Sequence, residues 1–390
     1  MPRINPQILT WARETAGLSV AEAARKMGFK DSGKGTAEER LLALEAGEAE
    51  PSRPQLVKAA SAFRRPLLAF YMPAPPAAAP SIEDYRTLPE VGEGRAEANL
   101  KTLVRDISVR QALVRDLLED EELEPRRFPG SLRLADGVAS TRLKVERELG
   151  WNAARFRGAA NSDKAFDYLR RLIEDAGIYV VLISDLGNHV TTIDVETFRG
   201  FALTDSLAPF IVINDQDAKS AWSFTLLHEL IHIGLGASGV SGKLMEGAVE
   251  RFCNDVASAI LLPPADLNSL AIEPDAFDEN RAAIRNFAQR MRVSGAMVTY
   301  RLYLDGRITE ADWRLLSNSF LADWRQYKAA QKEKRGAPDF YTVRRQRLGQ
   351  ALLAVVRRNV EGGTLSPVKA AKVLGVSPRG VDPLLTVRAA

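Results

Sequence analysis

The sequence predicts an α+β protein that is mostly helical. It has a bundle of five short helices, a core around a small sheet of about three strands, and a helical C-terminal region. Helix-start signals recur throughout residues 1–72, each followed by a run with helical spacing. Short runs rich in β-branched and aromatic residues lie between residues 178 and 214. From residue 266 to residue 390 the chain again has a helical pattern.

The composition is that of an ordinary soluble globular chain. Of the 390 residues, 46% are hydrophobic and 26% are charged, and this length allows two or three domains with their own cores. The net charge of +3 is too small to indicate nucleic-acid binding by composition alone. No run approaches about 18 consecutive apolar residues, so we expect no membrane partner. The start, Met-Pro-Arg-Ile-Asn-Pro, lacks the apolar segment of a secretion signal, and a single cysteine fits a reducing compartment; we expect a cytoplasmic protein.

Residues 1–72 carry clear helix boundaries. Asn5-Pro6 places a proline in the first turn of the first helix. Three further helices open on capping boxes, in which a Ser or Thr and a Glu or Gln three residues later satisfy each other's backbone N–H groups. These boxes are Ser19–Glu22, Thr36–Glu39 and Ser52–Gln55, and Gly28 and Gly47 mark two helix ends. With Ala43–Tyr71 completing five helices, this part resembles a repressor-type (XRE-like) helix-turn-helix domain.

The same residues leave DNA binding by this domain open. The turn Gly28–Gly35 is longer than the three or four residues usual between the two helices of such a motif. Glu38-Glu39 begins the helix that would enter the major groove, where acidic side chains would face phosphates. The nearby Lys30, Lys34 and Arg40 offset this in part. Operator binding therefore stands beside the alternative that the domain docks a protein partner or the remainder of its own chain.

Residues 73–94 are predicted to be a linker and connecting segment. Its first part, Pro-Ala-Pro-Pro-Ala-Ala-Ala-Pro over residues 73–80, should be extended and semi-rigid. Residues 95–126 then predict one long helix, because leucine, valine and isoleucine recur at helical spacing and charged residues cover the other side.

Residues 95–265 are expected to contain the functional core. The elements predicted in its first part are two helices, Thr141–Leu149 and Asp163–Ala176, and three strands, Ile178–Ile183, Gly200–Leu203 and Pro209–Asn214. A three-stranded sheet with helices on one side is the simplest arrangement of these elements. An extended peptide can add to an exposed sheet edge through backbone hydrogen bonds, and Phe210–Asn214 is a candidate for that edge.

Residues 224–232, Phe-Thr-Leu-Leu-His-Glu-Leu-Ile-His, hold the most informative pattern in the chain. His228 and His232 are four residues apart, so on a helix their rings project from one face, one turn apart. Glu229 lies where its carboxylate can reach a water held between them. Two imidazole ligands beside a general base predict Zn2+ at this site, with Mn2+ as an alternative ion, and Glu229 as the catalytic base. The competing interpretation is an apolar core helix that carries these residues without function.

Catalytic zinc needs a third protein ligand and leaves one position for water. A second helix is predicted over residues 247–263, where Glu250 shares a face with Cys253 and Asn254. If this helix packs beside the first, Glu250 completes a His-His-Glu metal site; otherwise it is a solvent-facing glutamate. Asn254 is a candidate to hydrogen-bond a ligating side chain, or else to lie in a helix–helix contact. His189, in Asp-Leu-Gly-Asn-His, is expected to be a turn residue.

Several separated blocks over roughly residues 80–390 resemble the ImmA/IrrE family of bacterial and phage metallopeptidases. The blocks are Thr225-Leu-Leu-His-Glu-Leu-Ile-His, the segment from Glu250 to Pro263, Gly200-Phe-Ala-Leu-Thr-Asp, Pro209-Phe-Ile-Val-Ile-Asn214 and Ile82-Glu-Asp-Tyr-Arg86. The resemblance implies a zincin-like peptidase core in which Glu250 is the third zinc ligand. Cys253 stands where the family usually has alanine, and Val256 where it usually has an aromatic residue. Neither change is expected to touch the site residues.

The C-terminal region, residues 266–390, ends in a basic segment. Within residues 340–390, nine Lys or Arg stand against two acidic residues, which makes this the most plausible nucleic-acid contact in the chain. Leu365–Ser377 also has the Ala-Ala-x-x-Leu-Gly-Val-Ser pattern of a helix-turn-helix. Pro378 and Pro383 would interrupt a recognition helix, so DNA contact stands beside a packing or autoregulatory role.

Together the patterns predict a zinc-dependent endopeptidase, with Glu229 as its base and His228, His232 and Glu250 as metal ligands. Family resemblance implies a protein substrate, a transcriptional repressor or similar regulator cleaved in a stress, phage or toxin–antitoxin-like response. The alternative is a DNA-binding transcriptional regulator whose metal site is structural or sensory, although such a site has no use for a base. A partner-binding module of a toxin–antitoxin pair is a third hypothesis. Tyr300-Arg301 is a candidate for stabilising the oxyanion on chemistry alone.

Overall fold

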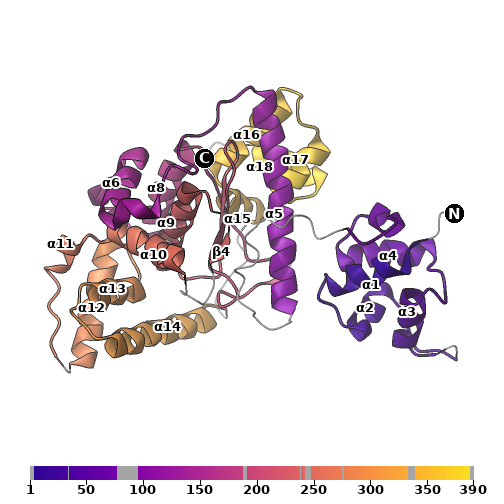
Figure 1. Cartoon of the computed structure of the whole chain (residues 1–390), viewed down its shortest axis with the longest axis horizontal. Helices are drawn as coiled ribbons and strands as arrows, with labels where there is room; N and C mark the ends of the chain where they lie inside the picture. The colour runs from indigo at the N-terminus through magenta and orange to yellow at the C-terminus, as the bar shows by residue number, and fades with distance from the viewer. Residues whose placement is uncertain are drawn as a thin grey trace. The chain divides into compact units, whose positions relative to one another are not determined.

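The computed structural model describes residues 4–33, 35–76, 95–187, 191–237, 239–241, 247–274, 276–332 and 339–386 (Figure 1). The described chain is mostly helical with one small sheet, as predicted. It divides into two compact units, one made of Met1–Glu83, Glu90–Asp106 and Asp185–Ile193, the other of the remaining residues. Most of the predicted linker, the Ile82–Arg86 segment and His189 lie outside the described residues.

Four α-helices and one 3-10 helix form the N-terminal part of the first unit. They are α1 (Pro6–Glu14), α2 (Val20–Met27), α3 (Ala37–Glu45), α4 (Arg53–Phe63) and η1 (Leu67–Tyr71). The predicted helix starts are confirmed. Asn5 accepts a hydrogen bond from the Gln7 N–H at α1, and both halves of each capping box are formed at α2, α3 and α4. The fifth predicted helix is the 3-10 helix, since only five residues follow Pro66 in helical conformation.

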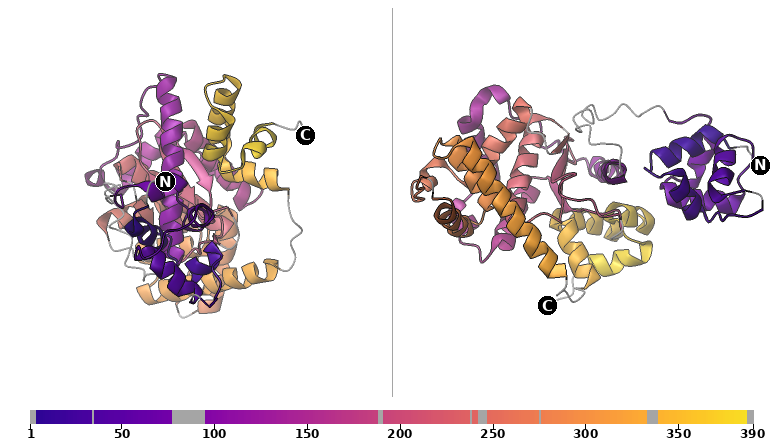
Figure 2. Two further views of the ribbon diagram at one scale, coloured as in Figure 1. Left: turned by 90° about the vertical axis from the view of Figure 1, so that its right-hand side faces the viewer. Right: turned by 90° about the horizontal axis from the view of Figure 1, so that it is seen from below.

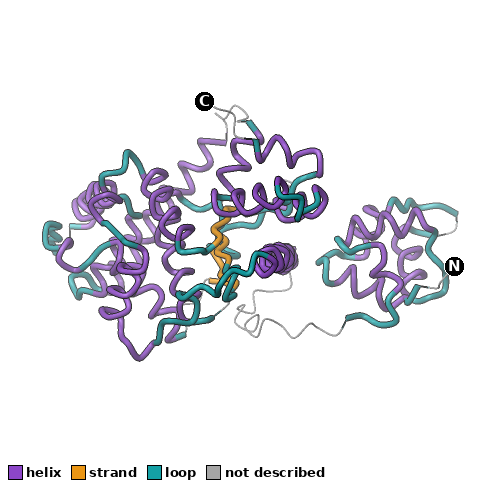
Figure 3. The backbone as a smooth tube through the Cα atoms, turned by 90° about the horizontal axis from the view of Figure 1, so that it is seen from above, coloured by secondary structure: helices purple, strands orange, loops and turns teal. Residues whose placement is uncertain are grey.

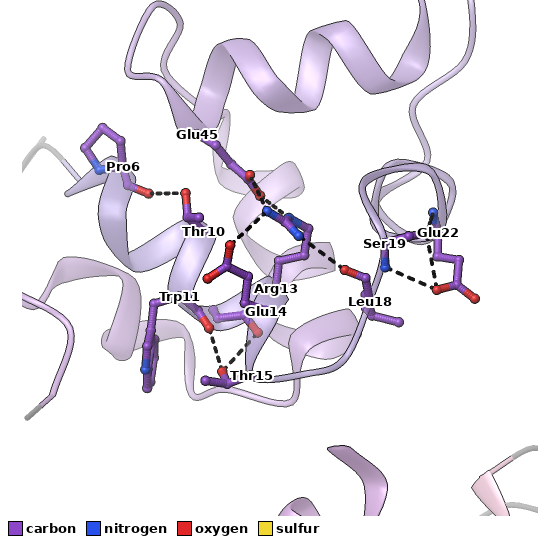
Figure 4. A network of polar contacts seen from close by, with 11 residues as sticks. Pro6, Thr10, Trp11, Arg13, Glu14, Thr15, Leu18, Ser19, Glu22 and Glu45 are labelled. Carbon is purple, nitrogen blue, oxygen red and sulfur yellow. Dashed lines mark hydrogen bonds and ion pairs between the residues drawn. The ribbon is translucent and has the colours of Figure 1, made fainter. Parts of the chain in front are cut away.

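Arg13 of α1 joins three segments of this bundle (Figure 4). Its guanidinium donates to both carboxylate oxygens of Glu45 in α3, at 2.7 and 3.0 Å, and to the carbonyl of Leu18 at 3.3 Å. Only 12% of the Arg13 side chain and 6% of the Glu45 side chain is exposed. A buried ion pair of this kind orients the two helices more than it stabilises the fold, because the cost of desolvation offsets much of the electrostatic attraction. It therefore ties the end of α3 to α1.

Four further α-helices of the described chain follow the N-terminal helices and precede the sheet. They are α5 (Arg95–Asp120), α6 (Gly137–Leu149), α7 (Ala153–Arg157) and α8 (Ser162–Asp175). The long helix was predicted to run to residue 126 but ends at Asp120, because Glu122 takes a left-handed conformation with φ of 53°. A left-handed residue just past the last turn closes an α-helix.

The sheet has four strands in the order β1-β3-β2-β4. They are β1 (Tyr179–Leu182), β2 (Gly200–Leu203), β3 (Phe210–Ile213) and β4 (Gly239–Ser241). β1 pairs with β3 in parallel, whereas the β2–β3 and β2–β4 pairs are antiparallel. The three predicted strands are present, and β4 is an addition, since three residues beginning with glycine carry little strand signal. The assignment of Phe210–Asn214 as an edge is wrong, because β3 lies between β1 and β2.

Helices cover both faces of this sheet, whereas the sequence predicted helices on one side only. One face belongs to a core shared with α8 and α9 (Lys219–Leu235), through Val180, Leu182, Ala202, Ile211 and Ile213. The alternate residues of β1, β2 and β3 are buried as well. On that side, Gln111 of α5 donates to the carbonyls of Leu203 and Ala208, both at 2.9 Å. Figure 3 shows the strands between α5 and the helices of the core.

Beyond the sheet, the chain continues as helices. They are α10 (Ala248–Leu261), α11 (Pro264–Leu267), α12 (Phe277–Met291), α13 (Gly295–Leu304), α14 (Glu310–Lys332), α15 (Phe340–Leu348), α16 (Gln350–Glu361), α17 (Pro367–Leu374) and α18 (Val381–Leu385). Two 3-10 helices, η3 (Leu134–Asp136) and η5 (Pro378–Gly380), complete the described elements. In the described part of the chain, no helix is both long enough and apolar enough to cross a bilayer.

A buried ion pair in α8 anchors the C-terminal helices. Arg170 and Glu174, 6% and 8% exposed, are joined by a bond of 3.0 Å from Nε to Oε1. Arg170 also donates to two carbonyls before the corner between α15 and α16, and Glu174 accepts from two N–H groups after it. These backbone partners are Gln346 and Arg347 for Arg170, and Gln350 and Ala351 for Glu174. α15 and α16 thereby lie against β1, the edge strand opposite β4 (Figure 2).

Several basic residues of the predicted DNA-contacting tail have partners within the chain, among them five arginines. Three arginines donate to backbone carbonyls of the tail, and two form ion pairs with the peptide segments beside it. The first group is Arg344 with Leu374 and Gly375, Arg345 with Pro383, Leu384 and Thr386, and Arg357 with Leu385; the second is Arg347 with Asp215 and Arg358 with Glu121. Much of the charge that suggested nucleic acid therefore holds the tail together.

Candidate metal centre

The two motif histidines lie on α9, a helix buried along most of its length. His228 and His232 are each 5% exposed and Glu229 is wholly buried. Because the histidines are one turn apart, their rings meet edge to face with centroids 4.8 Å apart, and their Nε2 atoms are 3.1 Å apart. The two Nε2 atoms therefore form a pair of candidate ligand atoms on the side of α9 that faces α10.

Glu250 of α10 completes the group. Its Oε2 lies 3.2 Å from His228 Nε2 and its Oε1 lies 3.2 Å from His232 Nε2. The candidate ligand atoms of the three residues all lie within 4.8 Å of one another, so the three could hold one metal ion. Two imidazole nitrogens and a carboxylate are the donor set of catalytic zinc sites, which keep a position open for water. The residues present therefore fit a divalent metal.

Asn254, one turn after Glu250, orients the first histidine. Its Oδ1 lies 2.9 Å from His228 Nδ1. When Nδ1–H donates to this amide oxygen, the lone pair of Nε2 is free to face His232 and Glu250. Metal-binding histidines are commonly held in the required tautomer by such a hydrogen bond at the other ring nitrogen. The expectation that Asn254 hydrogen-bonds a candidate ligand is confirmed.

The site favours positive charge. Burial opposes ionisation of Glu250, but hydrogen bonds and charge interactions with His228 and His232 outweigh it and hold the pKa of its carboxyl well below the usual range. Burial would lower the pKa of His232, yet hydrogen bonds to Cys253 and Glu250 raise that pKa well above its ordinary value. The carboxylate of Glu250 therefore favours positive charge at the two histidines, whether a proton or a metal ion supplies it.

Cys253 contacts the site, contrary to the sequence-based expectation. Its side chain is fully buried and hydrogen-bonds to His232, and burial raises the pKa of its thiol. The physical reason lies in helix geometry. Cys253 is three residues after Glu250, so both side chains face α9 from the same side of α10.

Glu229 faces the sheet at the first residue of β2. An ideal Cβ placed on Gly200 would lie 2.8 Å from Glu229 Oε1 and 3.0 Å from its Cγ. The carboxylate therefore rests against a backbone that carries no side chain.

The segment before α6 closes the end of the histidine helix. The Gly130 N–H donates to the Ile233 carbonyl at 3.1 Å, and the Leu132 N–H donates to the Gly234 carbonyl at 2.8 Å. A Cβ on Gly234 would overlap the Leu132 side chain. No local pattern in the sequence indicates this contact, because it joins segments about a hundred residues apart.

The candidates for oxyanion stabilisation are engaged elsewhere. The Tyr300 hydroxyl donates to Asp255 Oδ1 at 2.7 Å, and burial together with this bond raises the pKa of Tyr300. Burial lowers the pKa of Arg301, whose guanidinium interacts with the same Asp255. Both residues thus connect α13 to α10, the helix that carries Glu250.

Comparison with known proteins agrees with this site. Residues 174–303 match a peptidase family model described as the IrrE N-terminal-like domain (Peptidase_M78). No curated protein and no solved structure matches the chain. The matched segment contains His228, Glu229, His232 and Glu250, and the match supports a peptidase of the ImmA/IrrE type with a divalent metal, as the sequence predicted.

Proposed function

We propose that the protein is a zinc-dependent endopeptidase. The observation that carries this proposal is the convergence of His228, His232 and Glu250 from two helices inside the segment that matches a peptidase family. A purely structural metal site is closed by four protein ligands, whereas three ligands leave room for water. Glu229 beside the group supplies the remaining chemical requirement, a base.

In this proposal His228, His232 and Glu250 hold Zn2+. When bound, the metal would polarise the scissile carbonyl and lower the pKa of a water toward neutrality. Glu229 accepts the proton of the attacking water and passes it to the leaving amine. Glu229 is wholly buried and is next in sequence to the candidate ligand His228. Asn254 keeps the His228 ring in the tautomer that leaves Nε2 free.

The proposed substrate is a protein, specifically a transcriptional repressor or similar regulator, cleaved in a stress, phage or toxin–antitoxin-like response. The resemblance of the motif blocks supports this class. β4 pairs with β2 and ends the strand order on that side, while α15 and α16 lie against β1 at the other. An extended segment of the substrate would add to β4 by backbone hydrogen bonds.

The test compares wild-type protein with Glu229→Gln and Glu250→Ala, using as trial substrate any repressor that proves to be encoded beside the gene. We expect wild type and Glu229→Gln each to bind about one zinc ion, since three ligands remain. Only wild type should produce new peptide termini by mass spectrometry, because losing the base costs about 100-fold or more. Glu250→Ala should lose the metal. Equal biological effects of wild type and Glu229→Gln would instead support a regulator with a structural metal.

A further inference from the structure

Gly200 opens β2 directly beneath the histidine helix. It pairs with Ile213 of β3 and with Ser241 of β4, so its backbone is held on both sides. Its φ is not among the positive values of the chain, so an L-residue could adopt this backbone. Glycine inside a strand weakens the strand, and its presence often marks a close approach of another group. Position 200 therefore requires glycine because a side chain would not fit, and not because of its backbone conformation.

Two side chains of α9 fill that space. An ideal Cβ on Gly200 would lie 2.7 Å from Thr225 Cγ2, 2.8 Å from Glu229 Oε1 and 3.0 Å from Glu229 Cγ. Ordinary contacts of a Cβ with carbon or oxygen are well beyond 3 Å, so a side chain here must displace its neighbours. Thr225 and Glu229 are one turn apart, and both lean on the same glycine.

None of the three atoms nearest to a Cβ added at Gly200 belongs to a candidate metal ligand. The atoms nearest to Gly200 belong to Thr225 and Glu229, whereas His228, His232 and Glu250 meet on the side of α9 that faces α10. A methyl group at position 200 would therefore push the Glu229 carboxylate while leaving the metal ligands in place.

We infer that Gly200 is a positioning residue for Glu229. The missing side chain leaves room for the Glu229 carboxylate between α9 and β2. This inference rests on the proposed function, and it assigns a catalytic consequence to a glycine that touches neither metal nor substrate. Displacing a catalytic group by about 1 Å can cost about 100-fold in rate.

The test substitutes Gly200→Ala and uses Co2+ as a spectroscopic probe in place of zinc. Visible absorption of Co2+ reports ionisation at the metal, and its midpoint pH depends on the charge of Glu229 nearby. We expect Glu229→Gln to lower that midpoint, because a negative charge is lost. Gly200→Ala should shift it in the same direction, bind one Co2+ as wild type does, and cleave the trial repressor about 100-fold more slowly.

Two controls separate positioning from general packing. Ala202→Ser adds one atom to the same face of β2, two residues along, and should keep both the midpoint and the cleavage rate. Thr225→Ser removes the methyl group that lies nearest to the added Cβ. If Gly200→Ala/Thr225→Ser recovers thermal stability but not activity, the displaced group is Glu229; full recovery of activity would overturn the inference.

A folding failure is also informative. If Gly200→Ala does not fold, Gly200→Ala/Thr225→Ser/Glu229→Ala removes both obstructing side-chain groups and should fold again; failure of that triple variant overturns the inference. A shifted midpoint in Glu229→Gln with an unshifted one in folded Gly200→Ala overturns the inference alone. Unshifted midpoints in both, with no cleavage by wild type, reject the proposed function itself.

Discussion

The metal-free His232 has two partners that favour its protonated form, Glu250 at 3.2 Å and the Cys253 thiol. Those partners outweigh the effect of burial, so the folded pKa of His232 lies above its ordinary value. Glu250, whose pKa is depressed, stays ionised across the neutral range. A metal entering this site must therefore displace a proton from His232.

Zinc affinity should accordingly rise with pH until the pKa of His232 is passed. For each displaced proton the apparent affinity should change about tenfold per pH unit. Competition with a chelator of known affinity, measured from mildly acidic to alkaline pH, checks this. Cys253→Ala removes one of the partners that raise the pKa and should shift the plateau to lower pH. An affinity independent of pH would contradict the assignment of His232 as a ligand.

The two histidines could be predicted as candidate ligands from helix period alone, whereas Glu250 as the third also needed the family resemblance. His228 and His232 repeat every turn, and Glu250 and Asn254 repeat every turn on the next helix. The contact of Cys253 with His232 was available from the same period and was missed. Gly200 and Gly234 could not be found this way, because their neighbours come from distant segments that only the tertiary fold brings together.

Among the elements, the corner between α15 and α16 depends on one glycine. Gly349 has φ of 80°, and a Cβ there would overlap Glu174 Oε1 and lie 2.5 Å from Arg170 Nη2. Gly349→Ala should lower the free energy of unfolding by about 3–5 kcal/mol, because it separates a buried ion pair from its backbone partners. Chemical denaturation measures this. Gly363→Ala, at a φ of 75° with open space around the Cβ, is the matched control and should cost about 1 kcal/mol.

The helix α3 presents carboxylates where a DNA-reading helix would meet phosphates. Asp31 accepts from the Ala37 N–H at 2.8 Å, Glu39 caps Thr36, and Glu38 is exposed beside them. Arg40, which partly balanced this charge in the sequence, donates to the Lys30 carbonyl. The acidic start of α3 would repel DNA phosphates, while operator binding and protein docking by the N-terminal helices both stay predictions.

Reversing one of these charges should therefore create affinity for DNA. Glu38→Lys should strengthen non-specific duplex binding several-fold, and the gain should fall as salt is added, as for any new phosphate contact. Fluorescence anisotropy of a labelled duplex over a salt series measures it. Tight binding by wild type that Glu38→Lys weakens would show that α3 reads DNA after all.

For the second unit as a whole, the sheet has two different edges. Two features explain why the sequence predicted it incompletely. β4 is too short to carry a pattern, and helices from distant parts of the chain bury β1, β2 and β3 on both faces, which erases the polar alternation. α15 and α16 then lie against β1, from a region that looked like a basic tail. An unpaired strand edge can pair with another chain, and α15 and α16 lie where they would hinder such pairing at β1.

Removing that cover should make the protein associate. A chain ending after α14 loses α15 and α16 and exposes the backbone of β1 along Tyr179–Leu182. Sedimentation velocity should then show larger species that increase with concentration, because unpaired strand edges join. A shorter deletion that begins at Thr364 removes α17 and α18 but leaves α15 and α16 against β1, and it should sediment as the full chain does. If the longer truncation sediments like the shorter one, the C-terminal helices have some role other than protecting the sheet.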